Sequence, residues 1–451
     1  MNAAVGLVAL SALGLNVHQS STVGVAATKG SALGFVRIDA NWIDAEATEG
    51  QFDFTIFDAV VDAARAQNLQ VLAVLAYTPA WASVGDTLGD GPNNDVPRAG
   101  TYAAYVTAAV DHLKDRVTYY ELWNEPDLSQ FWEGSATDYV NDVLVPGADA
   151  LHAACPSCKV VGPAIATVGT TYADFLDTVL AAAQDKIDVV SGHDYAQFPQ
   201  DTPGAGGASD SFYNKLDVHR VVKVGDTVIY EGPLSFREVM NAHGATQPFW
   251  ITETGLEAAY GDATAEAAQT LYYRRVLESM LTRTWWTNTI FYEAFDEPPA
   301  QYHFGVCVDD PAASLGYDEK PVMALLRKAA ENQPLFGGTG TDCTDGLDND
   351  GDGLIDSADP DCATGNTEGS GPVDAGAPED DAGDAETDTS GGGCNTSGGR
   401  GGLGPLALGL ALVLARLGSR ARARRALALT VGSKRCTASH PSRRRSASPG
   451  R

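Results

Sequence analysis

Short apolar runs typical of β-strands alternate with amphipathic stretches from residue 13 to about residue 334, and this alternation is what most constrains the fold. Between the strand candidates, apolar residues recur at three- and four-residue spacing, as in 57–67, 101–114, 172–185 and 265–283. The eight strand candidates are 13–18, 35–42, 70–77, 117–125, 159–166, 188–195, 248–255 and 288–295. Eight such repeats predict an α/β chain folded as a (β/α)₈ TIM barrel. A doubly wound open sheet, the alternative, would need a Gly-rich phosphate-binding turn after an early strand, and the sequence shows none.

The connection between the sixth and seventh strand candidates, 196–247, is unusually long. It contains a Gly-rich segment followed by 221–230, where Gly225 and Asp226 indicate the turn of a hairpin. In a barrel, a loop that leaves the carboxyl end of a strand lies over the active face. We therefore expect this insertion to form one wall of a cleft.

Charge separates the chain into a body and a tail. The formal net charge is −29, but residues 400–451 hold 12 Lys/Arg and no Asp/Glu, so the rest carries 18 − 59 = −41. An acidic body argues against a nucleic-acid partner. With 44% hydrophobic residues the chain has enough apolar side chains for a large core, and we expect a monomer.

Two glutamates end strands four and seven of the predicted barrel. Glu125 lies in the sequence WNEP (123–126), and Glu253 lies in TETG (252–255). Because the carboxyl ends of all eight strands meet on one face, these side chains can converge although 128 positions separate them. Two carboxylates that flank a glycosidic bond are what its hydrolysis requires. A surface position or a structural ion pair is the ordinary alternative for any single glutamate.

These motifs, and the order of the eight elements over residues 13–334, resemble the clan A retaining glycoside hydrolases. The segments 123–132 and 77–82 resemble family 39 (β-xylosidase-like) and family 5 (cellulase-like) members, whereas 291–298 is similar to β-1,3-glucanases. The resemblance implies that Glu125 is the general acid/base, that Glu253 is the nucleophile, and that Asn124 binds the sugar 2-hydroxyl. It implies no metal or organic cofactor for catalysis.

Further residues are candidates for substrate binding by the same resemblance or by their place at strand ends. Arg37 resembles the clan's arginine beside the nucleophile, where a cation would keep Glu253 ionised; it can equally pair with Glu121, which shares the inward face of strand four. His193 and Tyr195 resemble the clan's polar residues near the nucleophile. Strands one, three and eight offer polar or aromatic contacts to a sugar in His18, Trp81 and Phe295; Phe295 takes the place of the clan's usual tryptophan.

The cysteine pairs predict local disulfides and therefore an oxidising compartment. A CxxC pair can be redox-active, can form half of a zinc site or can form a disulfide. Because the sequence has no second CxxC or His pair to complete a zinc site, we favour two local disulfides, Cys155–Cys158 and Cys343–Cys362. Between the second pair, acidic residues follow calcium-loop spacing without flanking helices, which resembles a thrombospondin type 3 repeat and predicts bound Ca²⁺; an acidic linker is the alternative. The expected ligands are Asp348, Asp350, Asp352, Asp356 and Asp359.

The end of the chain resembles the myxobacterial C-terminal sorting tail, in which a Gly-flanked cysteine (Cys394) precedes a short apolar run and arginines. That resemblance implies a tail transiently in the membrane and a protein that is secreted or displayed at the cell surface. The apolar run 3–15 lacks the basic flank and cleavage site of a signal peptide. The predicted parts are a catalytic barrel (1–335), the calcium segment (342–362), a disordered acidic linker (363–399), the sorting tail (400–425) and a basic extension (426–451).

The sequence thus predicts a hydrolase that cleaves β-glycosidic bonds of a poly- or oligosaccharide by double displacement. Two alternatives remain. One is a surface-anchored carbohydrate-binding protein on a degenerate barrel, which would have no need of both glutamates. The other is a transglycosylase, which would use the same two residues with a sugar in place of water.

Overall fold

The computed structural model describes residues 12–17, 22–167, 171–195, 213–224, 227–296, 302–310 and 313–331. Several predicted residues lie outside these ranges and stay predictions. They are His18, Cys343, Cys362, Cys394 and the five aspartates of the calcium segment.

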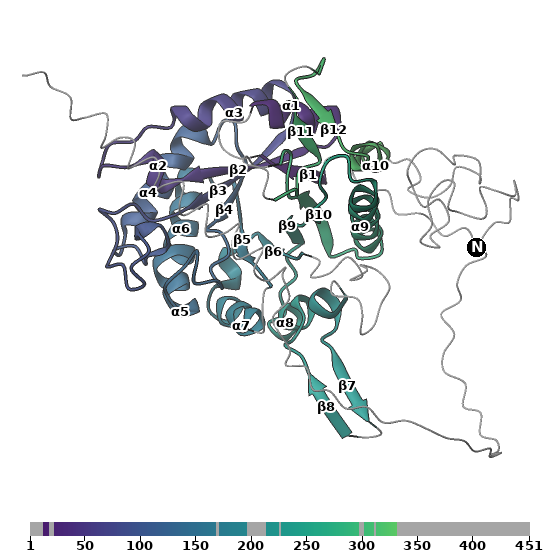
Figure 1. Ribbon diagram of the computed structural model, residues 1–451. Coiled ribbons are helices and arrows are strands. Elements are labelled where there is room, and N and C mark those ends of the chain that lie inside the picture. The colour runs from purple at the N-terminus through teal and green to yellow at the C-terminus, as the bar shows by residue number, and fades with distance from the viewer. Residues whose placement is uncertain are drawn as a thin grey trace, which may run out of the picture. The chain divides into compact units, whose positions relative to one another are not determined.

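Eight parallel strands form a closed barrel, which confirms the predicted fold (Figure 1). Around the barrel the order is β1, β10, β9, β6, β5, β4, β3 and β2, and β2 pairs with β1 to close the ring. The pairing of Leu15 with Phe291 joins β1 to β10, the first and last barrel strands along the chain. The bounds are β1 Leu13–Asn16, β2 Phe35–Asn41, β3 Gln70–Ala76, β4 Tyr119–Leu122, β5 Lys159–Ile165, β6 Val189–His193, β9 Phe249–Glu253 and β10 Trp286–Phe291.

Helices surround the barrel, as the α/β alternation predicts (Figure 1). They are α1 Thr22–Gly30, α2 Trp42–Ala45, α3 Thr55–Ala66, α4 Thr101–Leu113, α5 Ala136–Tyr139, α6 Val145–Ala154, α7 Tyr172–Ala183, α8 Phe236–Ala242, α9 Ala263–Leu281 and α10 Val322–Ala330. For two of these helices, side chains at the first residues explain where the helix begins. Ser235 and Glu238 form a capping box before α8, and the Asp262 carboxylate accepts the first N–H groups of α9.

The barrel interior is built in two layers. Apolar and aromatic side chains fill its lower part: Phe35, Leu72, Tyr119, Val161, Val189, Trp250 and Ile290. The rings of Phe35 and Tyr119 pack against that of Trp250, with centroids 5.4 and 4.9 Å away. Two residues further along three of these strands lie the polar residues Arg37, Glu121 and Thr252. The apolar layer therefore forms a packed floor under a buried polar layer.

Two antiparallel hairpins lie outside the barrel: β7 Val221–Val224 with β8 Thr227–Glu231, and β11 Cys307–Asp309 with β12 Tyr317–Glu319. The first is the predicted hairpin of the long insertion. It points away from the barrel beyond α8, and its side chains are mostly exposed (Figure 1). The prediction that the insertion walls a cleft therefore depends on residues 196–212, which the structure does not describe.

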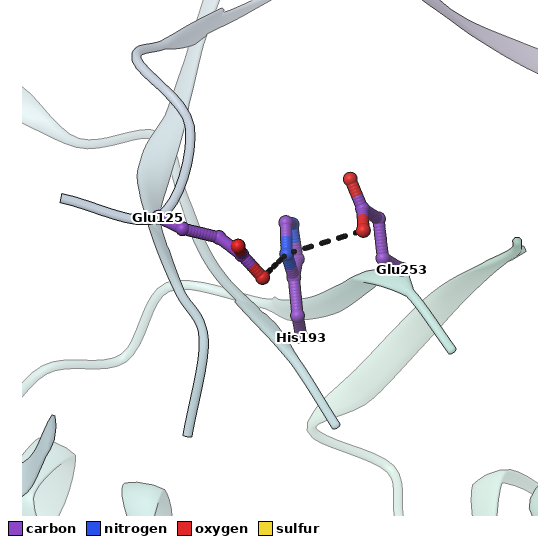
Figure 2. Close-up of side chains that lie close together, drawn as sticks. All are labelled: Glu125, His193 and Glu253. Carbon is purple, nitrogen blue, oxygen red and sulfur yellow. Dashed lines mark hydrogen bonds and ion pairs between the residues drawn. The ribbon is translucent and has the colours of Figure 1, made fainter. Parts of the chain in front are cut away.

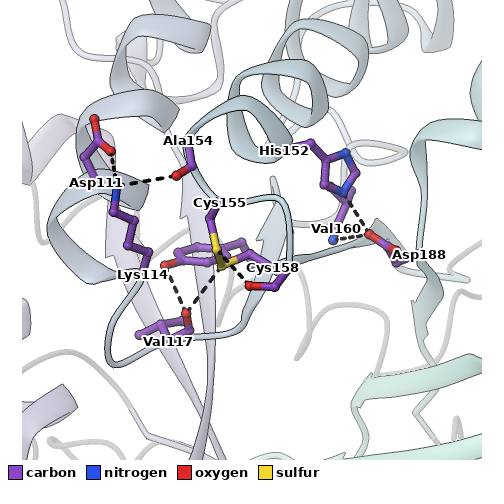
Figure 3. The surroundings of a disulfide bond; sticks show 11 residues. Asp111, Lys114, Val117, His152, Ala154, Cys155, Cys158, Val160 and Asp188 are labelled. Atoms are coloured by element: carbon purple, nitrogen blue, oxygen red, sulfur yellow. Dashed lines mark hydrogen bonds and ion pairs between the residues drawn. A yellow bond between two sulfur atoms is a disulfide. The ribbon is translucent and has the colours of Figure 1, made fainter.

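Cys155 and Cys158 are joined by a disulfide with an S–S distance of 2.04 Å, as predicted (Figure 3). The bridge links the residue after α6 to the residue before β5. Because both sulfurs are bonded to each other, the zinc alternative for this CxxC is not supported. Within the described ranges, no helix combines the length and apolar character needed to cross a membrane.

Candidate active site

The first catalytic candidate, Glu125, lies on a tight backbone segment just after β4. The strand ends at Leu122, three residues before the predicted end, and both Trp123 and Glu125 have positive φ angles of 88° and 45°. Non-glycine residues seldom adopt this conformation, and it concentrates at functional sites. Backbone hydrogen bonds hold it: Trp123 N–H donates to the Leu75 carbonyl and Glu125 N–H to the Ala164 carbonyl, each at 3.1 Å.

The second candidate, Glu253, is the last residue of β9, where the prediction placed it. Two donors contact its two oxygens. Arg37 Nη1 lies 2.5 Å from Oε1, and the hydroxyl of Tyr195 donates to Oε2 at 2.7 Å. Burial and the charge of Glu253 raise the pKa of Tyr195 well above its usual value, so this hydroxyl remains a donor.

Arg37 connects residues from four strands or their ends. Its Nε donates to Glu121 Oε2 at 2.7 Å, its Nη1 also donates to Asn16 Oδ1 at 2.9 Å, and its Nη2 donates to Asn124 Oδ1 at 2.8 Å. The sequence offered Arg37 two partners, the nucleophile and Glu121, and the structure shows both. Asn124, predicted to bind the sugar 2-hydroxyl, is thus held by the same guanidinium that contacts Glu253.

His193, the last residue of β6, lies between the two glutamates (Figure 2). Its Nδ1 is 2.8 Å from Glu125 Oε1 and 3.6 Å from Glu253 Oε2. One atom of each of the three side chains lies within 4.8 Å of the others. The predicted pair of carboxylates is therefore assembled on one face.

Burial favours the uncharged forms of Glu125 and His193. Burial raises the pKa of Glu125 well above its usual value, and the negative charges of Glu253 and Asp127 raise it further. Burial lowers the pKa of His193 well below its usual value, and the positive charge of Arg37 acts in the same direction. Glu125 Oε2 is buried without a hydrogen-bond partner among the described residues. A protonated carboxyl next to a neutral imidazole can deliver a proton.

Two other predicted residues are placed away from these contacts. The indole of Trp81 donates to the Glu46 carbonyl at 2.7 Å, and the Arg98 guanidinium lies over its ring. Phe295 packs edge-on against Tyr317 of β12, with ring centroids 5.5 Å apart. Their contacts to a sugar stay predictions.

Sequence reasoning missed several residues of the site. Tyr292 lies just after β10, with its ring 6.1 Å from that of Tyr195, so it is an aromatic residue at the end of this strand that lies beside the partner of Glu253. The signal was present in the segment FYEAF (291–295), but the predicted strand ran four residues too far. The others are the small polar residues Asn16, Ser191 and Thr252 of the barrel interior, together with Tyr77.

Among the described residues, two groups of side chains could offer ligands to a metal ion. Glu125, His193 and Glu253 form one, but these are the residues that the proposed chemistry uses. Asp86, Asp90 and Glu133 form the other, and they are largely exposed. The carboxylates of Asp86 and Glu133 accept backbone N–H groups of residues 87–91, so they order their own loop.

A closed (β/α)₈ barrel with convergent acidic, imidazole and phenol groups at the carboxyl ends of its strands has the architecture of a barrel enzyme. The family model described as glycosyl hydrolases family 39 matches residues 42–333. The chain belongs to this family.

Individual relatives are distant. The β-xylosidase of Geobacillus stearothermophilus is 24% identical over 280 residues, which cover 56% of this chain and 52% of that enzyme. The chain thus spans about half the length of this curated relative.

Solved structures agree with the fold. A family 39 glycoside hydrolase from the gut symbiont Bacteroides cellulosilyticus WH2 superposes with a TM-score of 0.52 at 18% identity, over 71% of this chain and 63% of that one. The family 39 enzyme from Xanthomonas axonopodis pv. citri gives 0.50 at 17% identity, over 73% and 68%. At these identities the likeness shows the fold alone.

Proposed function

We propose that this protein is a retaining β-glycosidase in which Glu253 is the nucleophile and Glu125 the acid/base. The observation that carries the proposal is the separation of the two carboxylates, which have oxygens within 4.8 Å of each other. Retaining enzymes hold their carboxyl groups about 5 Å apart, whereas inverting enzymes leave about 6.5–9.5 Å for a water molecule.

The surroundings of each glutamate support its role in a double displacement. Glu253, contacted by Arg37 and Tyr195, attacks the anomeric carbon while Glu125 gives its proton to the leaving oxygen. A covalent glycosyl-enzyme results. Its formation removes the negative charge of Glu253, so the pKa of Glu125 falls and this residue can take a proton from the attacking water. Release of the sugar restores both side chains.

A β-xyloside is the substrate to test first, because the curated relative is a β-xylosidase. The experiment measures turnover of aryl β-glycosides, xylans, β-glucans and mannans by the full chain, and follows the first-formed anomer by proton NMR. We expect β-product first, with Glu253→Ala inactive. An α-product first would overturn retention. Binding of polysaccharide without turnover by either protein would favour the carbohydrate-binding alternative, and sugar transfer in preference to hydrolysis would favour the transglycosylase.

The location of the protein is a separate proposal. The Cys155–Cys158 disulfide is typical of an oxidising compartment, which supports secretion or surface display.

For the calcium segment and the sorting tail the support is the sequence motif alone. Calcium binding is tested by titrating Ca²⁺ into the full chain with Asp350→Asn and Asp352→Asn variants beside it. Processing at Cys394 is tested by mass spectrometry of the mature protein.

A further inference from the structure

A buried glutamate, Glu121, lies under the site and has no place in the reaction described above. It is on β4, four residues before Glu125, and its side chain is fully buried. Its oxygens are all used within the barrel: Arg37 Nε donates to Oε2 at 2.7 Å, and the hydroxyls of Ser191 and Thr252 donate to Oε1 at 2.8 Å each. Three strands besides its own therefore hold this carboxylate.

The guanidinium of Arg37, which Glu121 contacts, has two terminal nitrogens that each contact a residue of the site. Nη1 contacts Glu253 and Nη2 contacts Asn124, the two residues proposed to act on the anomeric carbon and on the sugar 2-hydroxyl. A guanidinium is a rigid planar fork. Any rotation of that fork therefore displaces both contacts together, and Glu121 holds the Nε at its base.

Charge gives a second argument. A buried carboxylate is costly unless it is paired and hydrogen-bonded, and a glutamine of the same shape would avoid that cost. Arg37 already has a carboxylate partner in Glu253, so pairing alone does not explain a second one. With Glu121 present, the positive charge of Arg37 is shared between two carboxylates, and less of it is drawn to the carboxylate that attacks.

We propose that Glu121 is a positioning residue for the glycosylation step: it fixes the plane of Arg37 and takes up part of its charge, so that Glu253 stays nucleophilic and Asn124 faces the 2-hydroxyl. This inference rests on the proposed function. It predicts that replacing Glu121 lowers the catalytic rate per correctly folded active site. Replacing a purely structural residue would lower the number of folded sites and leave the rate per site unchanged.

The test compares Glu121→Gln with a matched control, Glu46→Gln. Glutamine fits the same space at residue 121, because the Ser191 and Thr252 hydroxyls can accept hydrogen bonds as well as donate them. Glu46 is equally suited as a control: it is buried, and it accepts from Trp42 Nε1 at 2.8 Å and from Gly50 N–H at 2.7 Å, outside the Arg37 network. Active sites are counted by burst titration with a dinitrophenyl β-glycoside, and kcat and KM are then expressed per active site.

For Glu121→Gln we expect per-site kcat for glycosylation to fall about 10- to 100-fold, with KM changed little, as for other residues that orient a catalytic group. Inactivation by the matching 2-deoxy-2-fluoro glycoside separates the effects of the two Arg37 contacts. That compound lacks the 2-hydroxyl, so a lower rate of inactivation reports the contact with Glu253. Any additional loss of rate with the normal substrate reports the contact with Asn124. Glu46→Gln should lower thermal stability and leave the per-site rate unchanged.

Equal per-site rates for Glu121→Gln and wild type would overturn the inference. If Glu121→Gln does not fold, Glu121→Asp replaces it, since the shorter side chain draws the carboxylate away from Arg37 Nε; a per-site rate identical to wild type would again overturn the inference. A wild-type protein without turnover would instead contradict the proposed function, and the two failures are therefore distinct.

Discussion

Glu125 and Glu253 face one another across the site in opposite surroundings. Glu253 receives two donors, one of them the charged Arg37. Glu125 contacts the neutral His193, has a buried oxygen without a partner among the described residues, and has a raised pKa. The same residue type thus lies in two environments that suit the two proposed roles, attack for Glu253 and proton transfer for Glu125, and it is the environment rather than the side chain that would decide the role.

The largest expected effect comes from removing the nucleophile. Glu253→Ala should lower kcat by a factor on the order of 10⁵, as when other covalent catalysts lose their nucleophile. Sodium azide should restore turnover and give an α-glycosyl azide, because the small anion attacks from the side that the carboxylate has left. A β-glycosyl azide from this variant would exchange the roles of Glu253 and Glu125.

Removing the acid/base should have a smaller effect that depends on the leaving group. Glu125→Ala should slow hydrolysis of alkyl or unactivated aryl glycosides by about 10²- to 10⁴-fold, the usual contribution of a general acid. The rate of glycosylation by a dinitrophenyl glycoside should be nearly unchanged, because dinitrophenolate leaves without needing a proton. A uniform loss across leaving groups, measured by pre-steady-state kinetics, would contradict the assignment.

The pH profile sharpens the comparison further. Because Glu125 must be protonated to act as the acid, kcat/KM should fall as pH rises through its elevated pKa. Burial also raises the pKa of Asp127, to about 7, and the ionised Asp127 disfavours ionisation of Glu125. Asp127→Asn removes that charge, so the basic limb should move to lower pH. A shift to higher pH would show that Asp127 acts on Glu125 through another contact.

The smallest expected effect on catalysis comes from a site remote from both glutamates. Replacing Cys155 and Cys158 by serine opens a four-residue loop, which should cost about 2 kcal/mol of the free energy of unfolding. Denaturant unfolding measures the loss. The basic limb of the pH profile should remain in place. Movement of this limb would mean that the disulfide influences the active site.

Much of the fold could be predicted because each strand has a clear apolar or β-branched pattern. The predicted strands run past their observed carboxyl ends, and the largest errors are at two of them. The ladder of β4 stops at Leu122, where Trp123 turns to positive φ, and β10 stops at Phe291, although YEAF continues the strand-like composition. Sequence patterns do not show where a backbone leaves the ladder, so they do not single out Tyr292, whose ring lies beside that of Tyr195.

Residues of the site that carry a distinctive chemistry were also found from the sequence. Glu125 and Glu253 follow from their strand ends, and the Arg37–Glu121 pair follows from the two-residue period of the strands. Asn16 and Ser191 were missed because a small polar residue in a strand resembles many others. Their importance depends on which strands become neighbours when the barrel closes, and that is a property of the whole chain.

The closure of the barrel also governs when the site can exist. The Asn16 amide donates to the carbonyls of Thr252 and Phe291, partners that are 236 and 275 positions further along the chain. Contacts of such long range form late and slowly in folding. A chain whose synthesis has not yet passed β10 has its first strand without the last strand that it pairs with. The candidate site is therefore absent until that point of synthesis, and it forms only when the first and last barrel strands along the chain meet.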